Sequence, residues 1–115
     1  MQKNIFGTKN EIIAANYLKL KNYQILEMNY KNKIGEVDIV AKDNNYLVFV
    51  EVKGRYSRKF GDPTEAVNFT KQQKIRSVAE LYLIKNKKTN SNCRFDVVAV
   101  LGEGDAEIRH IIDAF

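Results

Sequence analysis

The chain is poor in several residue types that often carry chemistry or stabilise small proteins. It has one cysteine, one proline, one histidine and no tryptophan. The single cysteine, Cys93, excludes an internal disulfide and a cysteine-rich zinc site. No apolar run is long enough to cross a bilayer, and the first residues lack the apolar stretch of a signal peptide. These absences predict a cytoplasmic protein with no membrane partner.

The size and charge of the chain narrow the class further. Its 115 residues fit one domain, residues 1–115, that is large enough to bury a core. The chain contains nineteen Lys and Arg residues and fourteen Asp and Glu residues, which gives a net charge of +5. A basic balance favours a polyanionic partner such as DNA or RNA, although many basic proteins bind neither.

The apolar pattern predicts an α/β domain of order α-β-β-β-α-β-β. Asp62, Pro63 and Glu65 have the spacing of a helix start, with a cap residue, proline in the first turn and glutamate three residues after the cap. A helix between the third and fourth strands should make those strands parallel neighbours, so the sheet is mixed. The expected elements are a helix over about 8–21, strands over 23–30, 35–42 and 46–53, a helix over 63–85, and strands over 94–101 and 107–112.

Two acidic residues interrupt apolar strands. Asp38 lies within residues 37–40 and Glu51 within residues 48–52, both otherwise apolar. A carboxylate in a buried strand is costly unless something compensates it. One reading is an ion pair with a lysine on a solvated face of the sheet.

The other reading is a metal site. Asp38 and Glu51 lie at similar distances on either side of the turn at residues 43–45, so a hairpin can bring them face to face. A divalent cation such as Mg²⁺ or Mn²⁺ would relieve their repulsion and could activate water for phosphodiester hydrolysis. Lys53, on the same strand face as Glu51, could then position the water or neutralise the phosphate.

These motifs resemble known proteins. The stretches 35–38 and 48–55 resemble the motif of the PD-(D/E)xK nuclease superfamily, with Val37 where that motif has proline. More narrowly, the whole chain looks like the YraN-type family of uncharacterised bacterial proteins, through Glu11, Asn29, Tyr30, Phe60, Gly61, Asp62, Pro63, Lys71 and residues 94–98. The resemblance implies a restriction-endonuclease-like fold, a mixed central sheet flanked by helices, related to archaeal-type Holliday junction resolvases. It also implies that Asp38 and Glu51 carry the metal and that Lys53 assists catalysis.

Two further residues have two readings each. Glu11 can complete a capping box with Thr8, or it can lie on the inward face of the first helix and join the metal site, as the resemblance to resolvases implies. Lys71 can extend from the edge of the core to solvent, or it can contact a phosphate beside the metal.

The basic segment after Lys53 also has two readings. Its side chains could fix phosphates and stack on an unpaired base, or they could form a solvated charge run. The candidates for nucleic-acid binding are Arg55, Tyr56, Arg58, Lys59 and Lys71.

The pattern therefore predicts a metal-dependent endonuclease acting on DNA, with branched or structured DNA as one substrate class. The alternatives are a non-catalytic nucleic-acid-binding module on the same fold and a protein-interaction scaffold. The small size favours action as a homodimer or with a partner. Asp96, a strand acid without an identifiable partner, and His110, more often structural in such a position, receive no role.

Overall fold

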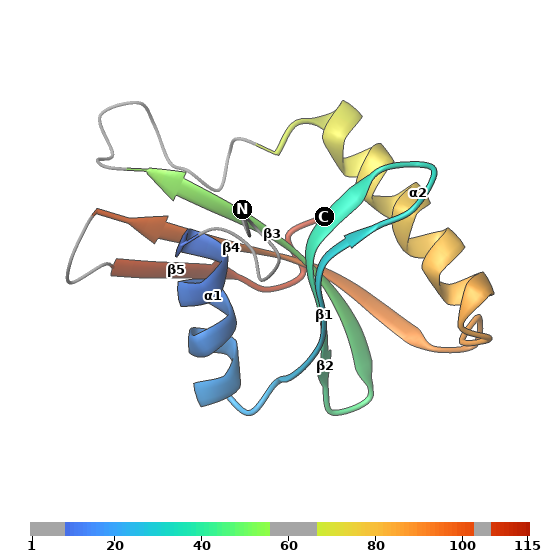
Figure 1. Ribbon diagram of the computed structural model, residues 1–115, viewed down its shortest axis with the longest axis horizontal. Helices are drawn as coiled ribbons and strands as arrows, with labels where there is room; N and C mark the ends of the chain where they lie inside the picture. The colour runs from blue at the N-terminus through green and yellow to red at the C-terminus, as the bar shows by residue number, and fades with distance from the viewer. Residues whose placement is uncertain (1–8, 56–66, 103–106) are drawn as a thin grey trace, which may run out of the picture.

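A five-stranded mixed sheet forms the centre of the molecule (Figure 1). The computed structural model describes residues 9–55, 67–102 and 107–115. None of the helices in these ranges is both long and apolar enough to cross a membrane. The elements in chain order are α1 (Lys9–Leu20), β1 (Gln24–Lys31), β2 (Glu36–Asp43), β3 (Tyr46–Arg55), α2 (Phe69–Lys85), β4 (Asn92–Leu101) and β5 (Glu107–Ile111).

The strands follow one another across the sheet in the order β1-β2-β3-β4-β5. The β3–β4 pair is parallel, from Tyr46 opposite Asn92 to Arg55 opposite Leu101, and the other three pairs are antiparallel. The predicted element order, crossover and mixed sheet are therefore confirmed. The strand boundaries lie within two residues of the predicted ones.

The two helices cover opposite faces of the sheet, each over its own apolar cluster. The buried residues Ala14, Ala15 and Leu18 of α1 pack on one cluster. The buried residues of α2 pack on the other, and they include Ile75 and Tyr82. Because β3 contributes to both clusters, residues 47–50 are buried on both sides, which is typical of a strand with a continuous apolar run.

The start of α2 differs from the prediction. Val67 and Asn68 are not helical, and the helix begins at Phe69. Asn68 is extended, and its side-chain oxygen accepts a hydrogen bond from the Lys71 backbone N–H at 2.9 Å. Asparagine satisfies the free N–H groups of a helix start as well as aspartate does, so this cap sets the boundary. The predicted start at Asp62 and Pro63 lies outside the described residues.

The side chains of β2 do not alternate strictly between the two faces of the sheet. Val37 packs in the α2 cluster, whereas Ile39 and Ala41 pack in the α1 cluster. The pairing of β2 with β3 ends at Ile39 opposite Val50, so β2 leaves its neighbour just where Asp38 and Glu51 follow. On its other side β2 still pairs with β1 here, with Met28 opposite Ile39 and Tyr30 opposite Val37.

Candidate functional site

Asp38 and Glu51 are the first residues beyond the last β2–β3 pair. Glu51 is buried, with 5% of its surface exposed, and Asp38 is partly buried. The carboxylate of Asp38 accepts a hydrogen bond from the Val52 backbone N–H at 2.8 Å. The side chain thus satisfies a donor of β3 where the ladder with β2 has stopped, which fixes the Asp38 carboxylate against β3 beside Glu51.

Two lysines contact Glu51. Lys71 of α2 places Nζ 2.6 Å from Glu51 Oε2, and Lys53 places Nζ 3.5 Å from the same oxygen. The hydrogen bond to Glu51 raises the pKa of Lys71 against the opposing effect of burial, and the charges of Glu51 and Asp38 add to the rise. Lys71 therefore stays charged next to the carboxylates.

Glu11 reaches the same place from α1. It forms a side-chain hydrogen bond with Asp38, and its Oε1 accepts a hydrogen bond from Asn29 Nδ2 at 2.8 Å. Gly54 of β3 allows α1 to approach this closely, because a Cβ there would collide with the Asn10 side chain. Glu11 thus lies on the inward side of α1. The competing capping box depends on Thr8, which lies outside the described residues.

The acidic cluster makes ionisation of Asp38 unfavourable. Burial, followed by the charges of Glu51 and Glu11, raises the pKa of Asp38 to about 8, and the hydrogen bond from Val52 opposes the rise only in part. At neutral pH and without a cation, the Asp38 carboxyl therefore holds a proton. A group that binds there must supply positive charge or leave the proton in place.

This arrangement predicts a pH-dependent stability. Asp38 has a higher pKa in the folded chain than in the unfolded one, so the stability it contributes is present at low pH and is lost as the pH rises toward about 8. Each pH unit between the two values costs about 1.4 kcal/mol. Asparagine at position 38 keeps one donor and one acceptor, like the protonated carboxyl.

We expect the free energy of unfolding of Asp38→Asn to equal that of the wild type near pH 5 and to exceed it by about 4 kcal/mol at pH 8. Urea unfolding in metal-free buffer at the two pH values would measure this difference. Glu36→Gln, at an exposed position of the same strand, should show none. Parallel pH profiles for the wild type and Asp38→Asn would contradict the assignment.

The donor set suits a hard cation bound mainly by water. Across residues 9–55, 67–102 and 107–115, no three or more His, Cys, Asp or Glu side chains are grouped to hold a metal ion. A cation here would therefore rest on Asp38 and Glu51 and complete its coordination with water, which Mg²⁺ commonly does. The two residues offer the oxygen ligands that Mg²⁺ and Mn²⁺ prefer.

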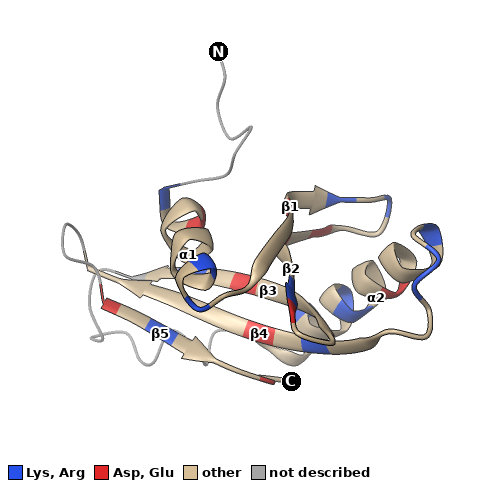
Figure 2. Cartoon of the chain, turned by 90° about the horizontal axis from the view of Figure 1, so that it is seen from below, with Lys and Arg blue, Asp and Glu red and all other residues tan. Residues whose placement is uncertain are grey.

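The remaining predicted residues belong to the basic segment after Lys53. Arg55 closes β3, paired with Leu101. Tyr56, Arg58 and Lys59 lie outside the described residues. Figure 2 shows basic positions along α2 and acidic positions on α1, β3 and β4.

Glu36, two residues before Asp38, lies outside the carboxylate cluster. It is exposed, and its carboxylate lies 3.5 Å from Lys31 Nζ, across the β1–β2 pair.

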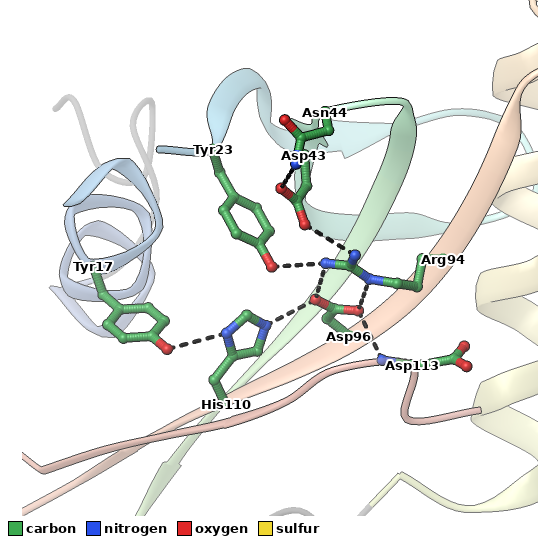
Figure 3. Close-up of polar contacts among 8 residues, drawn as sticks. All are labelled: Tyr17, Tyr23, Asp43, Asn44, Arg94, Asp96, His110 and Asp113. Atoms are coloured by element: carbon green, nitrogen blue, oxygen red, sulfur yellow. Dashed lines mark hydrogen bonds and ion pairs between the residues drawn. The ribbon is translucent and has the colours of Figure 1, made fainter. Parts of the chain in front are cut away.

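A second polar cluster, which the sequence did not predict, lies around Asp96 (Figure 3). Asp96 is fully buried and accepts hydrogen bonds from Arg94, from His110 Nε2 at 2.8 Å and from the Asp113 backbone N–H at 3.0 Å. His110 also contacts the Tyr17 hydroxyl at 3.1 Å. The cluster thus joins α1, β4, β5 and the residues that follow β5.

Arg94 extends this cluster to the last residue of β2 and to the residue that precedes β1. It donates to Asp43 at 3.0 Å and to the Tyr23 hydroxyl at 2.7 Å. Burial alone would raise the pKa of Asp96, but the hydrogen bonds from His110, Arg94 and Asp113 outweigh it and lower the pKa. Burial and the charge of Asp96 raise the pKa of Tyr17. The cluster therefore joins α1, β4, β5 and the residues after β5 through hydrogen bonds between buried or partly buried groups, as a structural network does.

Fold and site together define a class, a mixed α/β domain with buried carboxylates facing lysines where two strands separate. The model of the uncharacterised protein family UPF0102 matches residues 10–100, and the chain belongs to that family. It is 47% identical over 116 residues to a UPF0102 protein of Lachnoclostridium phytofermentans, covering 100% of this chain and 98% of the relative. It is 48% identical over 114 residues to one of Clostridioides difficile, covering 99% and 96%. The resemblance to a family of uncharacterised bacterial proteins is thereby confirmed.

Proposed function

We propose that this protein is a Mg²⁺- or Mn²⁺-dependent endonuclease of the PD-(D/E)xK type, with a restriction-endonuclease-like fold, that hydrolyses phosphodiester bonds in DNA. The observation that carries the proposal is the convergence of Asp38, Glu51 and Lys53 at the end of the β2–β3 ladder, with Glu11 added from α1. A salt bridge on a solvated face would leave Glu51 exposed. Here it is buried and has two lysine partners.

The cation, when bound, would lower the pKa of a coordinated water and offset the charge of the phosphate in the transition state. Asp38 and Glu51 would hold it, and Asp38 would give up its proton on binding. Lys53, which is largely shielded from solvent, would stay beside Glu51 and meet the developing negative charge. Glu11 would fix the orientation of Asp38 through their hydrogen bond.

Lys71 has a different role from Lys53 in the proposed hydrolysis. Its side chain is 45% exposed, so its ammonium group is free to turn from Glu51 toward solvent. Without a cation it supplies a positive charge to Glu51. Once a cation takes over that role, Lys71 can contact a phosphate at the mouth of the site.

The substrate and setting follow from the resemblance and the charge. The net charge of +5 favours a nucleic-acid polyanion, and the resolvase-like motif favours branched or structured DNA in the cytoplasm. Four-way junctions have twofold-related strands, so a homodimer would present two sites to one junction.

One observation favours a second candidate, a non-catalytic nucleic-acid-binding module. Glu51 already has two lysine partners, so its charge is compensated without a metal. Such a module would bind DNA with a steep salt dependence and take up no cation at the carboxylates.

A cleavage assay separates the two. Single-stranded, duplex and four-way-junction DNA would be incubated with the wild type in Mg²⁺, in Mn²⁺ and in EDTA, with Mn²⁺ binding followed by calorimetry. We expect cleavage in the presence of either cation and stabilisation of the fold by the cation. DNA binding without cleavage, together with no heat of Mn²⁺ binding at millimolar concentration, would leave the binding module as the better account.

A further inference from the structure

Asn29 has an unusual backbone for the interior of a strand. Its φ is 51°, in the left-handed region, although it lies within β1. Asparagine tolerates this conformation better than most residues with a side chain. The pairs Met28 with Ile39 and Tyr30 with Val37 lie on either side of it, so Asn29 lies across from Asp38. Backbone strain thus occurs directly beside the carboxylate cluster.

The side chain of Asn29 holds a member of that cluster. Its Nδ2 donates to Glu11 Oε1 at 2.8 Å, and Glu11 in turn is hydrogen-bonded to Asp38. The charge of Glu11 selects this orientation of the amide, because the opposite one would place two acceptors together. Asn29 is therefore the link between β1 and the glutamate of α1.

Asn29 Oδ1, at the other end of the amide, is buried, and no donor among the described residues hydrogen-bonds to it. Buried acceptors normally have a partner, which is often an ordered water. A carbonyl oxygen left open beside carboxylates is suited to receive a water that arrives with a cation.

We propose that Asn29 is a positioning residue of the carboxylate site, which fixes Glu11 against Asp38 and whose Oδ1 accepts a hydrogen bond from a water of the bound cation. This inference rests on the proposed function. It accounts together for the strained backbone, the hydrogen bond to Glu11 and the open acceptor. A purely structural role would account for the backbone alone.

Glycine separates the two roles, because it adopts a positive φ readily and removes only the side chain. Asn29→Gly should melt in EDTA within a few degrees of the wild type. We expect its Mn²⁺ affinity to fall about 10- to 100-fold, as when other groups that orient metal ligands are removed. Its kcat should fall, with KM for DNA little changed. Asn22→Gly is the matched control, since Asn22 is exposed and has a φ of 72°.

A double-mutant cycle tests whether Asn29 acts through Glu11. The losses in Mn²⁺ affinity from Asn29→Gly and Glu11→Gln should not add in the double variant, because each removes the same hydrogen bond. Additive losses, or Mn²⁺ binding by Asn29→Gly within twofold of the wild type, would overturn the inference and leave the proposed function standing. A wild type that binds no Mn²⁺ would overturn both, and that result is seen before any variant is made.

Discussion

Replacing Asp96 with asparagine is expected to lower the free energy of unfolding by about 3–5 kcal/mol, the cost of removing one partner of a buried ion pair. Asp96 is fully buried, and its two oxygens accept from Arg94, His110 and the Asp113 backbone. An amide offers one acceptor where the carboxylate offers two. It also leaves the Arg94 guanidinium, 11% exposed, with Asp43 as its remaining anionic partner among the described residues.

Urea unfolding near neutral pH would measure the loss. Asp113→Asn is the matched control, because the network uses only its backbone N–H, and we expect it to change stability by less than about 0.5 kcal/mol. The pKa of Asp96 lies below its ordinary value, so the stability it contributes is present above about pH 4 and is lost as the pH falls further. The difference in the free energy of unfolding between Asp96→Asn and the wild type should therefore become smaller as the pH falls below about 4. A loss below about 1 kcal/mol would show that the network is not structural.

Glu51→Gln is expected to reduce cleavage by at least about 100- to 1000-fold, the usual effect of removing a group that organises transition-state charge. The amide keeps the shape of the side chain but loses the charge that would hold a cation. It also loses the charge that now pairs with Lys71 and Lys53. DNA affinity in EDTA should stay the same or increase slightly, because two lysines are released.

Turnover of a four-way junction in Mg²⁺ would measure the effect, with filter binding in EDTA beside it. Glu36→Gln is the matched control, since Glu36 is exposed on β2 and its partner Lys31 is exposed as well. It should cleave at the wild-type rate. Equal cleavage by Glu51→Gln and the wild type would show that the activity does not come from this site.

The sequence predicted the fold well because local signals and long-range topology agree in this chain. The continuous apolar run of β3 predicted a strand covered on both faces, and the helix that follows implied the parallel pairing with β4. The start of α2 was predicted wrongly because two cap signals compete. Asn68 caps the helix, although Asp62, with Pro63 and Glu65 after it, matches the sequence pattern of a helix start more fully.

The candidate site could be predicted in its charged residues only. Asp38 and Glu51 stand out because acids are rare in apolar strands, and hairpin spacing brings them together. Asn29 entered the sequence analysis only as part of the family resemblance, because its contact with Glu11 depends on a left-handed backbone and on the approach of α1 over Gly54. The partners of Asp96 could not be predicted either, because His110 and Asp113 come next to Asp96 only when β5 pairs with β4.

The pairing of β5 with β4 also protects the protein against aggregation. Residues 97–101 of β4 form a fully apolar run that pairs with β3 on one side and with β5 on the other. Without β5, this run would become an open sheet edge, the kind that templates strand addition between molecules. The last strand thus acts as a guard against aggregation, and the hydrogen bonds from His110 and Asp113 to Asp96 keep it in place.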